Sequence, residues 1–197
     1  MNEFLTRTDF IKNFLEINQL NKRGFKQWAF YPGMLFNSQE KWWGKGGRRK
    51  RHHEGIDICL YKNDNGVVNE IGCGAKIPVM YKGEVIHVER DYIGTSVFVK
   101  HGERDFDGNS LLSIYGHTDP SDIMKPGTCI SEGDIIGCIA DTSGRSTTAK
   151  PHLHLSVLLV PDLLLREGIS WAEVERNCSV VIMDPLKIID CDYAVIR

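Results

Sequence analysis

A chain of 197 residues is long enough for one domain with a hydrophobic core, with or without appendages. Hydrophobic residues make up 42% and charged residues 25%, a balance typical of a folded globular protein rather than a disordered one. The formal net charge of -2 provides no attraction toward nucleic acid or an anionic membrane. No apolar run approaches the roughly 20 residues of a membrane-spanning helix.

The first 50 residues differ from the rest and predict an N-terminal extension. The opening stretch, MNEFLTRTDFIKNFLEINQL, predicts a short amphipathic helix with Phe10, Phe14 and Ile17 near one face and Thr8 as its N-cap. The segment that follows, WAFYPGMLFNSQEKWWGKGGRRKR, is rich in aromatic residues, glycine and basic residues. We therefore expect an N-terminal extension over residues 1–50 and a main domain over residues 51–197.

The opening stretch and the cysteines bear on the compartment. The stretch lacks the apolar region and small-residue cleavage site of a secretory signal, so the chain as written is expected in the cytoplasm. If a leader had been removed, the protein would be periplasmic or associated with the cell wall. The six cysteines form no C-x-x-C pair, which favours buried free thiols over a disulfide framework.

From about residue 53 to residue 160, short β-branched runs alternate with turns that contain glycine. One run, IPVMYKGEVIHVER, predicts a hairpin that turns at Lys82 and Gly83. The runs TSVFVKHG, LLSIYGHT, DIIGCIAD and HLHLSVLLV follow at close spacing. This pattern predicts a mainly β protein that forms an antiparallel sandwich or barrel.

The C-terminal part predicts a short helix and one more strand. Ser170 and Glu173 have the spacing of a capping box at the start of the helix SWAEVER. The run VVIM that follows predicts the strand.

Four of the seven histidines form, with one aspartate, a pattern that could carry chemistry. His53 and Asp57 lie in HHEGIDI, His117 follows a strand in YGHT, and His152 and His154 lie in HLH. Side chains two residues apart on a strand share a face, so His152 and His154 can point into the same cavity. Each piece is a weak signal by itself, and together they are more specific.

Two histidines and a carboxylate are a suitable ligand set for zinc. Imidazole nitrogen and carboxylate oxygen bind the ion and leave a position for a water molecule, whose pKa falls toward 7. The two remaining histidines could then handle protons during hydrolysis of an amide. The spacing does not decide whether His152 or His154 is the ligand.

The sequence resembles the lysostaphin/LytM-type zinc metallopeptidases. The motifs HHEGIDI, GEVIHV, TSVFVKHG, LLSIYGHT, EGDIIGCIADTSGRSTTAKPHLHLSV and DPLKII occur in that family's order over about two-thirds of the chain. The resemblance implies an antiparallel β fold, the duplicated hybrid motif, in which His53, Asp57 and His154 hold Zn²⁺. It also implies that His117 and His152 are the catalytic pair.

The function that this resemblance implies is zinc-dependent endopeptidase activity on the peptide cross-links of bacterial peptidoglycan, with water activated by zinc. One alternative is a non-catalytic module of the same fold that binds cell wall or activates an amidase. Another is a metallohydrolase that acts on a peptide from a different source. The sequence makes no prediction of oligomeric state.

Several features lie outside the family's usual pattern. Residues 62–74, KNDNGVVNEIGCG, are an insertion that could reshape one wall of the groove. Asn37 could fill the open zinc position, as a residue of an N-terminal segment does in some relatives. Trp42 and Trp43 are expected to pack over the sheet edge, with a platform for a sugar ring as the alternative. The basic run GKGGRRKRHH is expected to be a solvated loop that leads into the site.

Overall fold

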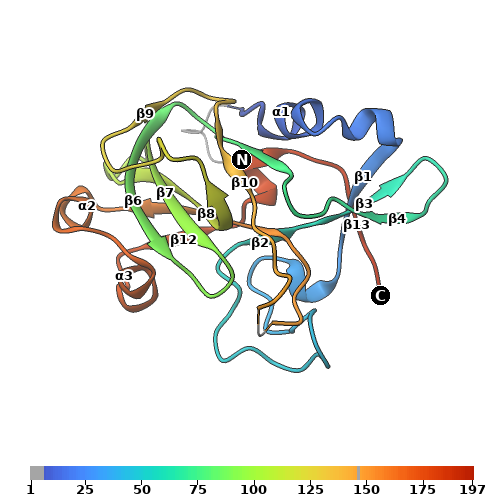
Figure 1. The fold of residues 1–197 in the computed structure, drawn as a ribbon. Helices are drawn as coiled ribbons and strands as arrows, with labels where there is room; N and C mark the ends of the chain where they lie inside the picture. The colour runs from blue at the N-terminus through green and yellow to red at the C-terminus, as the bar shows by residue number, and fades with distance from the viewer. Residues whose placement is uncertain (1–6, 146) are drawn as a thin grey trace.

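The computed structural model describes residues 7–145 and 147–197, so the first six residues of the predicted helical stretch lie outside it. The protein is mainly β, as predicted, and its sheets are not closed into a barrel (Figure 1). The strands are β1 (Phe25–Phe30), β2 (Ile56–Ile58), β3 (Leu60–Asn63), β4 (Val68–Glu70), β5 (Lys76–Pro78), β6 (Gly83–Arg90), β7 (Thr95–Arg104), β8 (Ser110–Pro120), β9 (Cys129–Ile130), β10 (Ile135–Ile139), β11 (Leu153–Val160), β12 (Val181–Met183) and β13 (Tyr193–Val195). The helices are α1 (Phe10–Ile17), α2 (Asp162–Glu167), α3 (Trp171–Arg176) and α4 (Leu186–Ile189), with short 3-10 helices η1 (Leu20–Arg23) and η2 (Pro32–Met34).

The larger sheet is organised around β11. Strand β8 pairs with one edge of β11 along its whole described length, while β2 and β12 share the other edge. The order continues from β8 through β7 and β6 to β9, and β10 joins β5 to β8. All eight residues of β11 are buried, because both faces of this strand are covered.

The two faces of β11 serve different purposes. Leu153, Leu155, Val157 and Leu159 point into the main hydrophobic core. The alternate residues begin with His154 and continue into a second apolar cluster, which includes Ile169 and Val174 from the C-terminal part. The period of two in a strand therefore separates a core face from a face that carries histidine.

The N-terminal segment shares the main core and adds a second sheet. Strand β1 pairs antiparallel with β3 and parallel with β13, and β4 completes this sheet beyond β3. Helix α1 buries Phe10 and Phe14, and the Phe14 ring meets the Trp28 ring edge-on at 5.7 Å between centroids. Residues 62–74, the predicted insertion, form the β3–β4 hairpin, which projects to the right in Figure 1. The boundary between an extension and a catalytic domain at residue 50 remains a prediction.

The predicted hairpin at Lys82 and Gly83 is wrong. Strand β5 pairs with β10, and β6 pairs with β7 and β9. A Cβ on Gly83 would lie 2.4 Å from the carbonyl oxygen of Lys100, so this glycine permits close approach of β7 instead of making a turn. The hairpin that does form joins β6 to β7 through residues 91–94.

Two predicted helix starts have different outcomes. Helix α1 begins at Phe10 with Asp9 as the N-cap, so the prediction of Thr8 is wrong by one residue; the Thr8 hydroxyl accepts the Phe10 N–H at 3.0 Å. Helix α3 begins as predicted, with the Ser170 side chain accepting the N–H of Glu173, a cap that typically stabilises a helix by about 1 kcal/mol.

Two predictions from composition can be compared with the structure. The six cysteines are free, but only Cys59 among them is buried. No helix among the described residues combines the length and the apolar character needed to cross a bilayer.

Candidate metal centre and active site

The register of three neighbouring strands brings distant residues of the sequence into one row. His154 in β11 lies opposite Asp57 in β2 on one side and opposite Gly116 in β8 on the other. A Cβ at position 116 would lie 3.3 Å from the Cβ of His154, so glycine makes room for the imidazole. The next residue, His117, then reaches the same place from β8.

Three side-chain atoms converge at the centre of this row. His53 Nε2 lies 3.0 Å from Asp57 Oδ1 and 3.1 Å from His154 Nδ1. His154 Nδ1 lies 3.0 Å from the same Asp57 Oδ1. All three residues are buried, and they are a group that could hold a metal ion.

The other nitrogen of each imidazole is engaged with a group that fixes its orientation. His53 Nδ1 donates to the carbonyl oxygen of Leu35 at 3.0 Å, and His154 Nε2 lies 2.9 Å from the Ser156 hydroxyl, which can accept a hydrogen from it or donate one to it. With these nitrogens protonated, the two nitrogens that face Asp57 Oδ1 carry lone pairs. Two lone pairs and a carboxylate oxygen directed at one point are the donor set of a cation site.

The second carboxylate oxygen of Asp57 is held by the N-terminal segment. Trp42 Nε1 donates to Oδ2 at 2.6 Å, and an Arg49 amino group donates to it at 3.3 Å. Burial acts to raise the pKa of Asp57. The charges that His53 and His152 carry when protonated, and hydrogen bonds from His154 and His53 in the tautomers that donate to Asp57, offset burial and hold the pKa well below its ordinary value. Asp57 is therefore an ionised carboxylate with Oδ1 directed toward the two imidazoles.

His117 sits in an irregularity of β8. Residues 115 and 118 of β8 oppose residues 97 and 95 of β7, so β8 carries one extra residue at this point. His117 has φ 62°, in the left-handed region that is uncommon for a residue with a side chain. A bulge of this kind changes the direction in which a side chain points, and here the His117 ring contacts the His152 ring at 4.7 Å between centroids. The His117 Nδ1 atom lies 3.0 Å from an oxygen of Asp91.

His152 immediately precedes β11 and is buried. Its Nδ1 donates to the carbonyl oxygen of Lys150 at 2.7 Å, and its Nε2 lies 3.7 Å from Asp57 Oδ1. The Trp42 ring meets it edge-on at 5.1 Å. Burial lowers the pKa of His152 to about 4, although the charge of Asp57 acts in the opposite direction, so the ring is neutral near pH 7.

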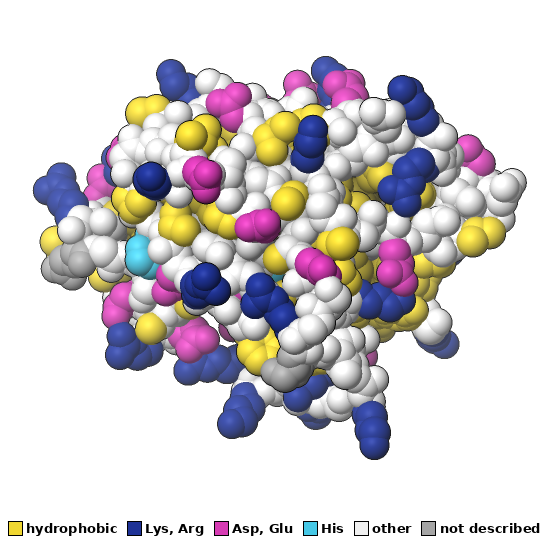
Figure 2. Space-filling model, in the orientation of Figure 1, with side chains coloured by type: hydrophobic (Ala, Val, Ile, Leu, Met, Phe, Trp, Pro, Cys, Tyr) yellow, Lys and Arg dark blue, Asp and Glu magenta, His cyan; other side chains and the backbone are white. Residues whose placement is uncertain are grey.

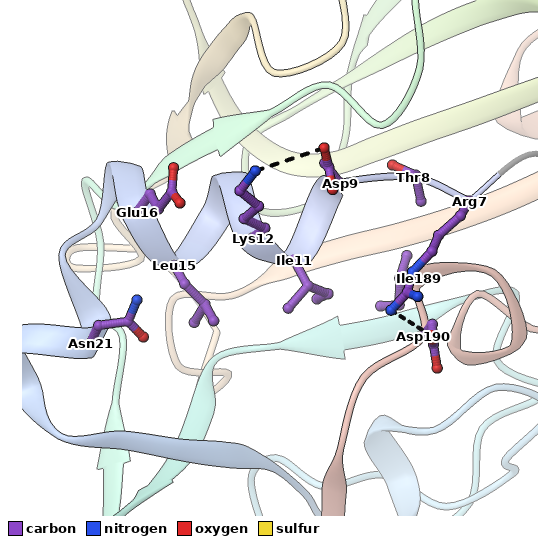
Figure 3. A pocket seen from close by; sticks show the side chains of 10 residues that line it. All are labelled: Arg7, Thr8, Asp9, Ile11, Lys12, Leu15, Glu16, Asn21, Ile189 and Asp190. Atoms are coloured by element: carbon purple, nitrogen blue, oxygen red, sulfur yellow. Dashed lines mark ion pairs between the residues drawn. The ribbon is translucent and has the colours of Figure 1, made fainter.

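A small groove of about 90 Å³ exposes this cluster at the surface. Its lining joins the histidines to aromatic and loop residues: Trp43, Arg49, Asp57, Tyr92, Ile93, His117, Thr147, Ala149, His152 and His154. A larger hollow of about 280 Å³ lies between α1 and the end of α4, where Arg7 pairs with Asp190 at 2.9 Å (Figure 3). None of the predicted site residues lines that hollow.

The structure brings together His53, Asp57, His117, His152 and His154. It does not place Asn37 in the groove: this exposed residue contacts the site through its main chain, donating to the His53 carbonyl at 2.9 Å. His52 is exposed and bonded to the Asn37 carbonyl, outside the three converging residues.

The tryptophans and the basic run have more specific positions than expected. Trp42 donates to Asp57 and Trp43 lines the groove beneath Arg49, whose guanidinium lies 4.6 Å from the Trp43 ring centre. Apart from Arg49 and the buried His53, the residues of the basic run are exposed, as expected of a solvated segment. Lys and Arg side chains project along the lower edge of Figure 2, where Figure 1 draws this loop.

Sequence reasoning missed the residues that support the cluster. Ser156 follows His152 and His154 at the same spacing of two, so the sequence could have predicted that its side chain lies on their face of the strand. Trp42, Arg49 and Asp91 carry no such signal, because nothing local shows that their loops lie against the histidines.

The donor set fits a zinc ion. Neutral imidazole nitrogen and carboxylate oxygen bind zinc at about 2.0–2.2 Å, and ligand atoms separated by roughly 3 Å can share one ion. The three atoms of His53, Asp57 and His154 have this spacing. The Leu35 carbonyl requires the hydrogen of His53 on Nδ1, and the Ser156 hydroxyl can accept a hydrogen from His154 Nε2.

Comparison with known proteins identifies the family. The sequence model described as Peptidase family M23 matches residues 51–160, more than half of the chain. The chain belongs to this family, which confirms the resemblance stated from the motifs. No curated protein sequence matches the chain.

Solved structures similar to this one include members of the same family. The solution structure of lysostaphin has a TM-score of 0.46 and 17% identity, and the match covers 83% of this chain and 57% of that one. A structure described as an M23 protein from Pseudomonas aeruginosa has a TM-score of 0.39 and 20% identity, with 82% and 63% covered. A prophage-encoded M23 protein from Enterococcus faecalis has a TM-score of 0.38 and 21% identity, with 66% and 84% covered. The chain thus spans less than two-thirds of the first two.

Proposed function

We propose that this protein is a zinc-dependent endopeptidase that hydrolyses the peptide cross-links of peptidoglycan. The observation that carries the proposal is the convergence of His53 Nε2, Asp57 Oδ1 and His154 Nδ1 in a member of peptidase family M23. The choice of substrate rests on the motifs that resemble the lysostaphin/LytM-type enzymes.

In this proposal His53, Asp57 and His154 hold the metal. Bound zinc would polarise the scissile carbonyl and make water more acidic. The Leu35 carbonyl keeps His53 in the tautomer that binds a cation, and the Ser156 hydroxyl orients the His154 ring. Trp42 and Arg49 keep Asp57 Oδ1 turned toward the two imidazoles.

His117 and His152 are the proposed catalytic pair. In each ring Nδ1 is engaged, with Asp91 in one case and the Lys150 carbonyl in the other, so Nε2 is the nitrogen available to substrate. In the reaction, water adds to the carbonyl carbon and the C–N bond breaks. One proton leaves the water and another reaches the departing amine, and these are the transfers that the two Nε2 atoms would assist.

The test combines metal analysis with digestion. Purified full-length protein should contain close to one zinc per chain and release peptides from purified sacculi, with the cut bond identified by mass analysis of the products. Glycine-rich peptides should be tested beside the sacculi. If the protein hydrolysed only unrelated peptides, the cell-wall assignment would be wrong. If it bound zinc but hydrolysed none of these substrates, the proposal that it is an enzyme would be wrong.

The variant His154→Ala gives the specific control. It should lose both zinc and hydrolysis, because it removes one of the three ligand atoms. His52→Ala is the matched comparison, since His52 is a neighbouring histidine that lies outside the converging atoms. Equal loss in both variants would mean that the location of the metal is wrong.

A further inference from the structure

The carboxylate of Asp91 receives five hydrogen bonds. Its Oδ1 accepts from the main-chain N–H groups of Ile93 at 2.9 Å and Gly94 at 2.6 Å, and from His117 Nδ1 at 3.0 Å. Its Oδ2 accepts from the Ser96 hydroxyl at 2.7 Å and from the main-chain N–H of His117 at 2.8 Å. The side chain is only 8% exposed. Asp91 therefore binds both the backbone and the ring of His117.

A second turn aspartate shows which of these bonds a turn requires. Asp105, in the hairpin between β7 and β8, accepts the N–H groups of Asp107 and Asn109 and the Asn109 side-chain amide. All of these donors belong to its own hairpin. Asp91 makes the corresponding turn bonds with Oδ1 alone, and its remaining contacts reach β7 and the extra residue of β8. Its role consequently extends beyond stabilising the turn.

We propose that Asp91 is a positioning residue that fixes His117 in the orientation and tautomer needed for hydrolysis. An ionised carboxylate can only accept hydrogen bonds, so its contact with the ring requires a hydrogen on His117 Nδ1. The neutral ring then has its lone pair on Nε2, the nitrogen available to substrate in the groove. The importance of this tautomer for activity rests on the proposed function.

The electrostatics of Asp91 are consistent with this role. Burial acts to raise the pKa of Asp91, but the hydrogen bond from the His117 ring and those from the N–H groups of Gly94 and His117 lower it far below its ordinary value. Asp91 Oδ2 also accepts the main-chain N–H of His117, whose positive φ is an unfavourable conformation for a residue with a side chain. The carboxylate thus stabilises the bulge that aims the ring.

The position of Asp91 is itself braced by the C-terminal part. The Trp171 indole donates to the Ser96 hydroxyl at 2.9 Å, and this hydroxyl donates to Asp91. The main-chain N–H of Trp171 donates to Glu89 at 2.8 Å. A Cβ at Gly94 would lie 2.7 Å from the Thr118 carbonyl oxygen, so the turn is pressed against β8. These contacts, which hold Asp91 and through it His117, are here called the clamp, and they involve β6, β7, β8 and α3.

The first experiment observes the tautomer directly and needs no substrate. Protein with ¹⁵N-labelled histidine is studied by long-range ¹H–¹⁵N NMR above pH 7, and the His117 signals are assigned by their loss in His117→Gln. We expect the hydrogen on Nδ1 in the wild type. A hydrogen on Nε2 in the wild type would overturn the proposal, whatever the substrate proves to be.

The second experiment compares Asp91→Asn with Asp105→Asn in the zinc-loaded full chain. The amide keeps the shape of the carboxylate but carries an NH2 group in place of one oxygen. In either orientation this NH2 group faces a donor, His117 Nδ1 at the Oδ1 position or the main-chain N–H of His117 at the Oδ2 position, so the hold on His117 is weakened. Hydrolysis of sacculi by Asp91→Asn should then fall by roughly 10²-fold in kcat with little change in KM, the usual scale for a proton-transfer group. Zinc content should not change, and Asp105→Asn should behave as the wild type.

The outcomes separate this inference from the proposed function. A kcat for Asp91→Asn equal to that of Asp105→Asn would overturn the positioning role. If Asp91→Asn does not fold, Ser96→Ala provides the test, because it removes one donor to Asp91 and leaves the carboxylate in place. This variant should reduce kcat by a few-fold. A kcat equal to that of the wild type, together with a His117 ring that carries its hydrogen on Nε2, would contradict the positioning role of Asp91. Absence of zinc or hydrolysis in the wild type, with the Nδ1–H tautomer present, would contradict the proposed function and leave the clamp standing.

Discussion

Two aspartates with little exposed side chain, Asp57 and Asp91, contact different histidines of the cluster, and their hydrogen bonds differ in one respect. Asp57 gives Oδ2 to Trp42 and Arg49 and directs Oδ1 at two imidazole nitrogens whose lone pairs face it. Every contact that Asp91 makes with His117 and with its own turn is a hydrogen bond that the carboxylate accepts from an N–H group.

This difference shows how one residue type can take two roles within a few ångströms. Lone pairs and a carboxylate oxygen that face one another need a cation between them, whereas a carboxylate surrounded by N–H and O–H groups is already satisfied. The Asp57 end is therefore suited to bind a metal and the Asp91 end to orient a side chain. The predictions below test this distinction, from the largest expected effect to the smallest.

The largest effect is expected at the Asp57 end on removal of the metal. Treatment of the wild type with a strong chelator should abolish hydrolysis of sacculi, and added Zn²⁺ should restore it. Because metal binding contributes to folding stability, the melting temperature should also decrease on chelation. Hydrolysis that persists after complete removal of metal, measured by elemental analysis, would show that the Asp57 cluster has no catalytic metal.

The two proposed catalytic histidines should lose activity without losing metal. His117→Ala and His152→Ala should each lower kcat by about 10²–10⁴-fold, the range for a general acid or base, with zinc content close to the wild type. Full activity in His152→Ala would remove this residue from the mechanism. Identical behaviour of the wild type and His117→Ala would favour a non-catalytic module.

The residues that hold Asp57 Oδ2 should affect metal affinity more than chemistry. Trp42→Phe keeps the ring and removes the indole donor, and Arg49→Gln removes the charge. Each should weaken zinc binding by about 10–100-fold in a chelator competition assay, the usual cost of losing a group behind a ligand. Arg48→Gln is the control, since Arg48 bonds to Gln39 and not to Asp57. An effect of Arg48→Gln as large as that of Arg49→Gln would indicate a general effect of loop charge.

The smallest effect concerns a buried histidine that pairs with no carboxylate in the described contacts. His101 bonds to the Ser113 hydroxyl at 2.7 Å, and burial lowers its pKa to about 4. Since the unfolded chain takes up a proton near pH 6.5 and the folded one near pH 4, the stability present at neutral pH is lost as pH falls through this window. The free energy of unfolding should decrease by up to about 3 kcal/mol between pH 7 and pH 4.

Urea denaturation of the wild type and His101→Gln at several pH values measures this contribution. The variant should lose less stability on acidification than the wild type. Parallel pH profiles for the two proteins would show that His101 does not carry the effect.

Much of the fold followed from local patterns. Alternating β-branched runs predicted the strands, and Ser170 with Glu173 predicted the start of α3. The hairpin at Lys82 and Gly83 failed because a glycine inside a strand, pressed against a neighbouring strand, has the same local signature as a turn. The residues of a strand do not by themselves specify which other strand it pairs with.

The sequence by itself predicted the chemical parts of the proposed site: two imidazoles and a carboxylate for a metal, two more imidazoles for protons, and His152 and His154 on one side of a strand. Spacing of two carries this information because a strand alternates its side chains. Only the tertiary structure decided that Asp57 is held by Trp42 and Arg49, and that Asp91 reaches His117 across 26 residues. These contacts depend on the register between β2, β11 and β8 and on one extra residue in β8, and both are properties of strands packed together.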